Sequence, residues 1–317
     1  MKTLLVSGAL GQIGSELVPA LRARHGADRV VATDIRAPAG EARDGPFEIL
    51  DCTLPERLDA VVLRHGVGTI FHLAAQLSAV AEKNPQEAWR LNMASLTAVL
   101  DVARQHRCAV FFPSSIGAFG PSTPRQHAPQ DAIQRPTTIY GITKVAGELL
   151  CDYSVARFGI DVRGLRLPGL ISHATPPGGG TTDYAVDMFR HAVSDRPYVC
   201  YLERGTSLDM MYMPDAIRGI VELMEFDGAH LRHRNAFNVT AMNFAPEELA
   251  TEIQKWVPGF VVHYVVDPVR QAIAESWPRS IDDSAARTEW GWRPAFDLAS
   301  MTRDMLGKLG LTAASGR

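Results

Sequence analysis

The sequence predicts an α/β fold in which a doubly wound parallel sheet is followed by a smaller C-terminal part. Apolar runs alternate with helical patterns in the first half, and the composition changes after about residue 165. The runs typical of buried strands are Thr3–Ser7, Arg29–Asp34, Thr69–Leu73 and Cys108–Ser114. The stretches with apolar residues at helical spacing are Ile13–His25, Leu54–Arg64 and Glu87–Arg104. This alternation is typical of parallel strands joined by right-handed crossover helices.

A glycine-rich turn follows the first predicted strand and opens the first predicted helix. It contains Gly8, Gly11 and Gly14, with Gln12 and Ile13 between the last two. In a Rossmann dinucleotide site the first glycine permits a tight turn, the second lets a pyrophosphate approach, and the third lets the helix pack closely. The helix N-terminus then offers N–H groups to the phosphates. The motif alone is weak, and it predicts such a site because of this strand–turn–helix context.

An acidic residue at the end of the second predicted strand favours NAD as the cofactor. Asp34 lies about 20 residues beyond the glycines, where a carboxylate accepts hydrogen bonds from the adenosine ribose hydroxyls. That carboxylate also repels the 2′-phosphate of NADP, although the nearby Arg36 weakens this argument. We expect Asp51 to face the adenine, with a solvated loop acid as the alternative. The small run Leu73, Ala74 and Ala75 lets the cofactor pass the strand edge.

Composition and charge exclude several classes of protein. The formal net charge is −3 and charged residues make up 21% of the chain, which gives no basic excess for nucleic acid or anionic lipid. No apolar run approaches the length of a membrane helix, so we expect no membrane partner and a cytoplasmic protein. The four scattered cysteines are typical of reduced, buried thiols. The histidines show no metal-binding spacing, and we expect no metal site.

A tyrosine and a lysine on the next helical pattern predict acid–base chemistry. Tyr140 and Lys144 lie one turn apart on one helix face, in a pattern that reaches about Phe158. A lysine ammonium near the phenol, together with a positively charged nicotinamide, favours the phenolate that a general base requires. Ser115 ends the fourth predicted strand and is placed to hydrogen-bond a substrate hydroxyl or carbonyl. A surface Tyr/Lys pair is the alternative interpretation.

This set of motifs resembles the short-chain dehydrogenase/reductase superfamily, in its extended branch that includes nucleotide-sugar epimerases and dehydratases. The resemblance runs from Met1 to about Pro294. It implies catalytic roles for Ser115, Tyr140 and Lys144, with Tyr140 and Lys144 also contacting NAD. Other cofactor positions that it implies are Asn92, Leu167 and Pro168, of which Asn92 alternatively packs its helix.

One stretch is similar to the substrate loop of short-chain L-threonine 3-dehydrogenases. It begins at Pro168 and includes Gly180, Thr181 and Thr182. Exposed backbone N–H groups and hydroxyls there suit a small substrate with a carboxylate. The alternative is a flexible loop that closes a helix start, with Thr182 or Asp183 as its N-cap.

Two further positions are implied by the same resemblance, each with a structural alternative. Ser78 is expected to contact the substrate, or to be a loop serine without a role. Trp277 is expected to form a lid or wall over the substrate, or to be a buried anchor.

The reaction that the resemblance implies is NAD-dependent oxidation of L-threonine at C3 to 2-amino-3-oxobutanoate. Tyr140, as general base, removes the hydroxyl proton, and Ser115 orients the hydroxyl. Two alternatives stay open: a nucleotide-sugar epimerase, in which the hydride returns to the sugar, and a redox-inactive protein that senses NAD. Ile116 and Gly117 follow the strand serine where a dehydratase usually needs an acid, which disfavours a dehydratase.

The domain organisation follows from the change in composition. We expect residues 1–165 to form a Rossmann NAD-binding domain, to which a segment at about 206–242 returns. Residues 166–205 and 243–317 then form the substrate-binding part, with a long loop at Pro168–Thr182, a helix at Pro246–Trp256 and a strand at Phe260–Val266. The superfamily resemblance also implies a homodimer that pairs the helices Glu87–Arg104 and Tyr140–Phe158.

Overall fold

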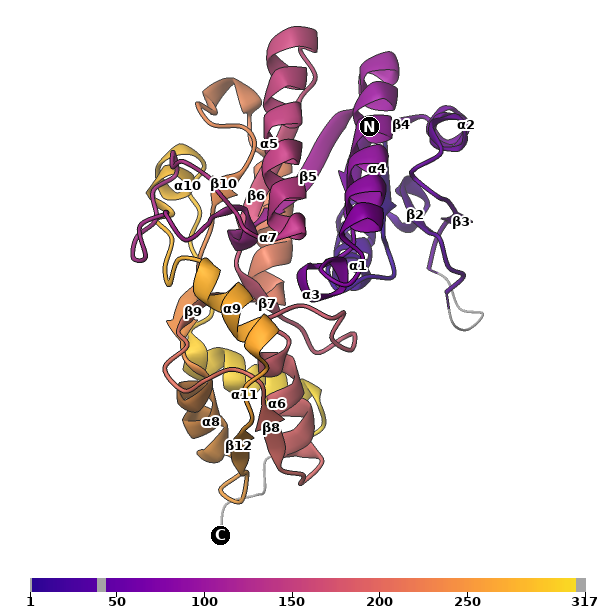
Figure 1. Ribbon diagram of the computed structural model, residues 1–317. Coiled ribbons are helices and arrows are strands. Elements are labelled where there is room, and N and C mark those ends of the chain that lie inside the picture. Colours follow the sequence, from indigo (N-terminus) through magenta and orange to yellow (C-terminus); the bar gives the residue numbers. More distant parts are fainter. Residues whose placement is uncertain (1, 39–43, 312–317) are drawn as a thin grey trace.

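The computed structural model of the chain describes residues 2–38 and 44–311, and it is built around one large parallel sheet (Figure 1). Within the described residues the sheet has seven strands in the order β10-β6-β5-β4-β1-β2-β3, and all its pairings are parallel. The strands are β1 (Thr3–Ser7), β2 (Val30–Asp34), β3 (Phe47–Ile49), β4 (Val67–His72), β5 (Ala109–Ser115), β6 (Val162–Leu167) and β10 (Phe237–Asn238). The order reverses between β1 and β4, which is where doubly wound sheets bind their ligands.

Helices cover both faces of this sheet. One face carries α1 (Gly14–His25) and α7 (Met213–Glu225), whose apolar residues share a core with Val6, Val30 and Phe111. The other face carries α2 (Pro55–His65), α4 (Pro85–His106) and α5 (Ile139–Phe158). In Figure 1, α4 and α5 run side by side along the sheet. The predicted doubly wound α/β class is therefore confirmed.

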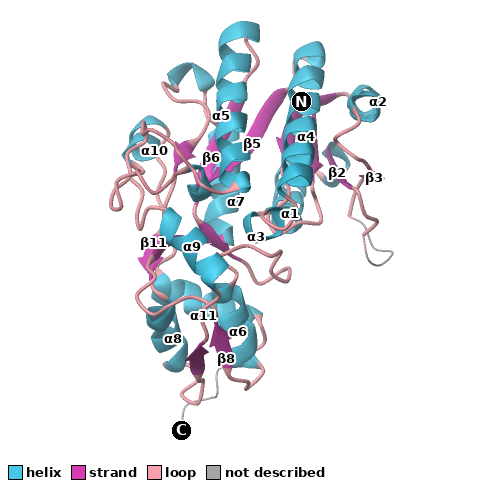
Figure 2. Cartoon of the chain, viewed as in Figure 1, coloured by secondary structure: helices cyan, strands magenta, loops and turns pink. Residues whose placement is uncertain are grey.

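The second part of the molecule lies below the carboxyl end of the large sheet (Figures 1 and 2). It contains a three-stranded sheet in the order β11-β9-β7 and a parallel pair of β8 and β12. These strands are β7 (Gly169–Ile171), β8 (Tyr198–Cys200), β9 (Leu208–Tyr212), β11 (Met242–Phe244) and β12 (Val262–Tyr264). Its helices are α6 (Tyr184–Val193), α8 (Pro246–Gln254), α9 (Pro268–Ser276) and α11 (Leu298–Lys308). Their buried side chains form a separate core around Phe189, Phe244 and Met301.

The chain crosses between the two parts several times. Strand β9 joins the small sheet, and the following α7 and β10 return to the large one. After the short helix α10 (Ser284–Glu289), Trp290 and Trp292 pack in the same core as α7. A Cβ at Gly219 would lie 2.9 Å from the Trp292 ring, so this glycine lets the indole approach the helix closely. We expected these residues to belong to the substrate-binding part. The two tryptophans instead attach them to the large sheet.

Local details differ from the sequence expectations in three places. The predicted loop Pro168–Thr182 contains a strand, β7, because Gly169–Ile171 pairs with Met210–Tyr212. The predicted strand Phe260–Val266 shortens to β12, which pairs only with β8. The strand β3 was not predicted, since its three residues are half-buried or exposed at the sheet edge and carry little periodic signal.

Candidate active site

The glycine turn has the geometry that its spacing predicts. Gly8 has a φ of +69°, in the left-handed region, and a Cβ there would lie 2.9 Å from the backbone nitrogen of Ala74. A Cβ at Gly14 would lie 2.4 Å from the carbonyl oxygen of Gly8, so α1 approaches β1 as closely as backbone atoms allow. A side chain at Gly14 would push the helix away from the strand, and one at Gly8 would collide with the backbone of Ala74 just after β4. The turn thus leaves the N-terminus of α1 open toward the end of the sheet.

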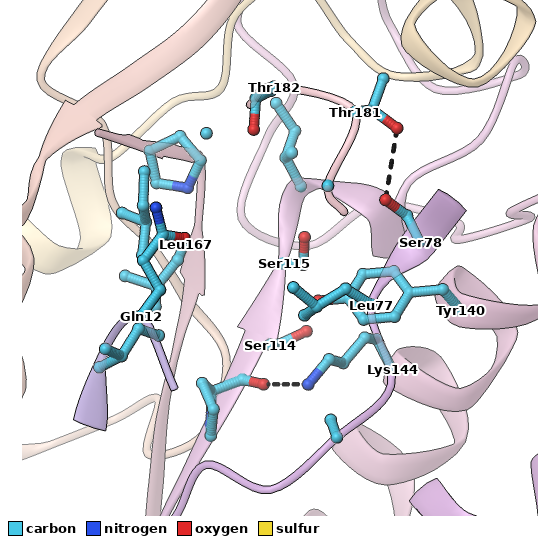
Figure 3. A pocket seen from close by; sticks show the side chains of 18 of the residues that line it. Gln12, Leu77, Ser78, Ser114, Ser115, Tyr140, Lys144, Leu167, Thr181 and Thr182 are labelled. Carbon is cyan, nitrogen blue, oxygen red and sulfur yellow. Dashed lines mark hydrogen bonds between the residues drawn. The ribbon is translucent and has the colours of Figure 1, made fainter. Parts of the chain in front are cut away.

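A cavity extends from this turn to the end of β5, and its walls match a dinucleotide (Figure 3). The predicted cofactor residues that line it are Gly8, Gly11, Gln12, Ile13, Gly14, Leu73, Ala75, Tyr140, Lys144, Leu167 and Pro168. The Nε2 atom of Gln12 is buried and finds no hydrogen-bond partner among the described residues. An unpaired buried donor beside a helix N-terminus suits a phosphate oxygen. These residues therefore fit NAD.

Asp34 ends β2 beside the glycine turn and does not line the cavity. It is 6% exposed, and its Oδ2 accepts a hydrogen bond from the backbone nitrogen of Leu10 at 3.1 Å. Its Oδ1 accepts from the backbone nitrogen and from Nε of Arg36, at 3.2 and 3.3 Å. The side chain of Arg36 is two-thirds exposed, so this ion pair stays close to solvent. Asp34 thus links the second strand to the glycine turn while its charge remains near the expected ribose position.

The other predicted cofactor residues lie outside the cavity walls. Asp51 accepts hydrogen bonds from the amide and hydroxyl of Thr53, at 2.9 and 2.7 Å. Ala74 lies behind Gly8. The amide of Asn92 is used within the protein, because its Oδ1 accepts from the Gln76 amide at 2.8 Å and its Nδ2 donates to Thr143 Oγ1 at 3.2 Å. Asn92 thereby joins α4, the segment after β4 and α5, a structural role that its helix position alone did not reveal.

The three catalytic candidates converge at one end of the cavity. Thr138 caps α5 by accepting a hydrogen bond from the amide of Gly141 at 3.1 Å, and this sets the first turn that carries Tyr140. Ser115 ends β5, and its Oγ accepts from the Gly117 amide at 3.1 Å. Figure 3 shows Ser115, Tyr140 and Lys144 around the same space, with Tyr140 and Lys144 on successive turns of α5. The structure therefore places together the residues that the sequence paired.

Burial opposes the ionised forms of Tyr140 and Lys144, which the expected acid–base chemistry needs. Burial raises the pKa of Tyr140 to about 12, against the lowering effect of a hydrogen bond with Ser115. Burial also lowers the pKa of Lys144 to about 8, partly offset by the carboxylate of Glu148. We expected Lys144 to lower the pKa of Tyr140, but its Nζ donates to the carbonyl oxygen of Pro113 at 2.6 Å and lies 5.4 Å from the phenol ring centroid. Without the positive nicotinamide the protein therefore keeps the phenol protonated.

Beneath these groups lies a buried ion pair that the sequence analysis did not identify. Arg166 on β6 forms two hydrogen bonds with Glu148, at 3.0 and 2.8 Å, and both side chains are almost fully buried. Glu148 also accepts from Ser114, which neighbours Ser115, and from Gln134 at 2.9 Å. Because Glu148 follows Lys144 by one helical turn, this network joins β5, β6 and α5 directly below the catalytic candidates.

The substrate end of the cavity is formed by the loop before α6. Ser78 at the start of α3 (Ser78–Ala81) is buried, and its Oγ lies 3.3 Å from Thr181 Oγ1 across the cavity (Figure 3). Gly180, Thr181 and Thr182 line the cavity, as predicted. The amides of Gly179 and Gly180, however, donate to the carboxylate of Asp183 at 2.8 and 2.7 Å. The expectation of free N–H groups on these glycines was therefore wrong.

Asp183 is the residue that the sequence analysis missed. Its carboxylate folds back on the preceding glycines and makes no side-chain hydrogen bond as an N-cap of α6. Asp183 lines the cavity, and among the described lining residues it is the only acid. Burial raises its pKa, while the two glycine amides and Arg270 act against that rise. The Asp at the start of an amphipathic helix was the available signal, but it equally predicts a cap.

Trp277 forms another wall of the cavity. The residue follows α9, is 5% exposed, and packs in the same core as Phe189 and Phe244. Its indole nitrogen is buried and has no hydrogen-bond partner among the described residues. Trp277 is therefore both a core residue, as in the anchor interpretation, and a residue of the cavity wall.

Three further features concern partners and cofactors. Among residues 2–38 and 44–311 no group of three or more His, Cys, Asp or Glu is arranged to hold a metal ion. The four cysteines, Cys52, Cys108, Cys151 and Cys200, are buried free thiols. In the same described part of the chain no helix is both long and apolar enough to cross a membrane.

Comparison with known proteins agrees with this geometry. The chain is 54% identical over 308 residues to an uncharacterized epimerase/dehydratase of Staphylococcus saprophyticus, covering 96% of each chain. An L-threonine dehydrogenase structure from Clostridium difficile has a TM-score of 0.95 and 54% identity, with 98% of each chain covered. The holo form of a GalE-like L-threonine dehydrogenase from Cupriavidus necator has a TM-score of 0.94 and 51% identity, covering 97% of this chain and 99% of that one.

The glycine turn, the Tyr140/Lys144 pair and these similarities lead to one assignment. The NAD dependent epimerase/dehydratase family matches residues 4–239, which include the large sheet except Thr3, and every catalytic candidate. The chain therefore belongs to the NAD dependent epimerase/dehydratase family, within the extended short-chain dehydrogenase/reductases, and uses NAD.

Proposed function

We propose that this protein is an NAD-dependent L-threonine 3-dehydrogenase. The observation that carries the proposal is the meeting of the Ser115, Tyr140 and Lys144 group with a small polar enclosure formed by Ser78, Thr181 and Asp183. The solved structures named above as L-threonine dehydrogenases, which match over nearly the whole chain, support the choice of substrate.

The substrate fits this enclosure through its charges. The carboxylate of Asp183 receives the ammonium group, because it is the acid among the described lining residues. The buried indole N–H of Trp277 and the hydroxyls of Ser78 and Thr181 supply donors for the carboxylate. These contacts direct C3 and its hydroxyl toward Ser115 and Tyr140.

The chemistry then follows from the protein groups. NAD⁺, held by the glycine turn and the cavity walls, would supply the acceptor for the hydride that leaves C3 of the substrate. Tyr140, as phenolate, takes the proton of the C3 hydroxyl, while Ser115 hydrogen-bonds the same oxygen as it becomes a carbonyl. Lys144, in the second turn of α5, keeps a positive charge beside the phenolate. The product is 2-amino-3-oxobutanoate, a β-keto acid.

The first experiment measures absorbance at the NADH band with purified protein, NAD⁺ and L-threonine. Parallel reactions contain L-serine, L-allo-threonine or UDP-galactose. Sustained NADH formation with L-threonine is the expected result. Conversion of the UDP-sugar without net NADH would instead establish an epimerase, and NAD⁺ binding without turnover of any substrate would establish a sensor. Either outcome would overturn the proposal while leaving the family assignment intact.

We also propose a cytoplasmic homodimer that pairs α4 and α5 with the same helices of a second copy. These adjacent helices expose large apolar side chains, and exposed apolar surface of this kind marks interaction sites. The exposed residues are Trp89, Ile142, Leu149, Tyr153 and Phe158. Burying them in a two-fold interface would place the catalytic helix α5 at the centre of the dimer.

A further inference from the structure

The substrate loop is held from behind by a tyrosine that does not line the cavity. The hydroxyl of Tyr201, just after β8, accepts a hydrogen bond from the backbone nitrogen of Tyr184 at 2.8 Å. The same hydroxyl donates to the carbonyl oxygen of Thr181 at 3.1 Å. One oxygen atom therefore closes the turn that contains Thr182 and Asp183. Burial raises the pKa of Tyr201, which keeps the hydroxyl protonated and able to donate.

Tyr201 is itself fixed on three sides. Its carbonyl oxygen accepts a hydrogen bond from the amide of Asp267, the N-cap of α9, at 2.9 Å. The guanidinium of Arg270, in the first turn of α9, lies 4.1 Å from the centroid of its ring, a cation–π contact. The ring of Tyr184 meets it edge-on, with the centroids 6.3 Å apart. The phenol can thus rotate very little, and its hydroxyl is aimed at the loop.

This arrangement couples two walls of the cavity. One wall is the loop from Gly180 to Asp183, which Tyr201 contacts directly. The other is Trp277, which follows the same helix α9 that supplies Arg270. The loop also has its internal bonds to Asp183, the contact of Thr181 with Ser78 and the close approach of Thr182 to Gly169. The Tyr201 hydroxyl therefore connects this loop to the α9 side of the cavity.

We propose that Tyr201, stacked on Arg270, is a positioning residue that sets the affinity for the amino-acid substrate without touching it. It does so by fixing where Thr181 and Asp183 present their polar groups. The cofactor end of the cavity is built by other elements, β1, α1 and β4, so NAD binding is independent of Tyr201. This inference rests on the proposed function, since it assumes that the loop binds the substrate.

The test is Tyr201→Phe, which keeps the ring and its stack on Arg270 but removes the hydroxyl. We expect KM for L-threonine to rise about tenfold, because two hydrogen bonds of the loop are lost. The value of kcat should stay within about threefold, since Tyr140 and Ser115 are unaffected, and the Kd for NAD⁺ should not change. Arg270→Lys, which keeps the charge but loses the planar stack, should raise KM by a smaller factor.

A matched control pair lies in the same second part of the molecule. Tyr264 on β12 lies under Arg204, whose guanidinium is 4.4 Å from its ring centroid, and neither residue lines the cavity. Tyr264→Phe and Arg204→Lys should therefore leave KM and kcat unchanged. An equal rise of KM in both tyrosine variants would show a general effect on the second part of the molecule, and it would overturn the positioning role of Tyr201.

A second readout does not depend on turnover. Hydrogen–deuterium exchange in peptides covering Gly179–Ala185 should be faster in Tyr201→Phe than in wild type, since the Tyr184 amide loses its acceptor. Faster exchange with an unchanged KM would show that the loop is held by Tyr201 but does not set substrate affinity, and the inference would fail. If wild-type protein oxidises no amino acid while exchange still responds, the proposed function fails instead.

Discussion

The Nζ atom of Lys144 lies 2.6 Å from the carbonyl oxygen of Pro113, so the catalytic helix α5 is joined to strand β5 by a hydrogen bond from a buried ammonium group. Lys144 is 5% exposed, and burial lowers its pKa to about 8. In the proposed mechanism the same atom stays charged beside Tyr140, so that the phenolate can form. The protein thus maintains a buried charge that catalysis needs and that folding alone disfavours.

Replacing this lysine should separate stability from activity. Because the folded-state pKa is lowered, the charged lysine destabilises the fold below about pH 8, and the penalty fades as the pH rises from about 8 toward 10.5. We expect Lys144→Met to abolish turnover. In cofactor-free protein at pH 7 it should nevertheless raise the free energy of unfolding by about 2 kcal/mol, a value that already allows for the lost hydrogen bond to Pro113. Urea unfolding at pH 7 and pH 9.5 measures this gain, which should shrink at the higher pH.

The exposed Lys83 supplies the control for that experiment. Lys83→Met should change stability by less than about 0.5 kcal/mol at either pH, as is usual for surface substitutions. A Lys144→Met protein that is less stable than wild type at both pH values would show that the ammonium group stabilises the fold.

Removing the Tyr140 hydroxyl should remove the general base and nothing else. Tyr140→Phe is expected to lower kcat by at least about 100-fold, the usual contribution of general base catalysis. The Kd for NAD⁺, measured by fluorescence titration, should change less than about twofold, because the glycine turn is distant from the phenol. The exposed Tyr153 is the matched control, and Tyr153→Phe should be fully active. A near wild-type rate in Tyr140→Phe would exclude Tyr140 as the base.

The pH dependence of turnover should follow the ionisation of Tyr140. Its pKa in the protein alone is raised to about 12 by burial, against the lowering effect of the Ser115 hydrogen bond, so the phenol is protonated at neutral pH. In the proposed mechanism the positive charge of bound NAD⁺ lowers this pKa further. We therefore expect kcat for L-threonine oxidation to rise about tenfold per pH unit from pH 6 until the phenol in the NAD⁺ complex is half ionised. A flat profile of kcat from pH 6 to pH 9 would contradict this mechanism.

Cofactor preference should depend on Asp34. Asp34→Asn keeps an oxygen that accepts from the Leu10 amide, but it removes the charge that repels a 2′-phosphate. We expect kcat/KM to fall about tenfold with NAD and to rise with NADP, because Arg36 is then released from its ion pair and is free to meet the phosphate. An unchanged ratio of the two kcat/KM values would refute the ribose assignment.

The proposed dimer should depend on the apolar face of α5. Leu149 is 62% exposed on that helix, and Leu63, which is 61% exposed on α2, provides a control at equal exposure. Leu149→Arg should shift the sedimentation coefficient to that of a monomer, because a charge would be buried in the interface. Leu63→Arg should leave the wild-type coefficient unchanged. Equal coefficients for all three proteins would argue against an interface at α5.

Much of the nucleotide half was predictable because it depends on local physics. The strand β1 and the glycine turn were predicted from neighbouring residues, since a left-handed φ at Gly8 and a close approach at Gly14 each require a missing side chain. The Tyr140/Lys144 spacing likewise follows from a single helix. Buried thiols and a small net charge needed no knowledge of the fold.

The substrate half was harder to predict from the sequence, because its geometry joins residues that are far apart in the chain. The sequence predicted exposed amides in the glycine run and offered Asp183 only as one of two possible caps, whereas the structure pairs Asp183 with the amides of Gly179 and Gly180. The contact of Ser78 with Thr181 spans 103 residues, and nothing local to either residue indicates it.

The sequence by itself therefore determined the α/β class, the NAD cofactor and the helical spacing of Tyr140 and Lys144. Only the tertiary structure decided which groups surround the substrate, how Tyr201 fixes their loop, and how deeply Tyr140 and Lys144 are buried. The physical reason is that backbone conformation and helical spacing depend on adjacent residues. Desolvation and long-range hydrogen bonds depend instead on which segments pack together.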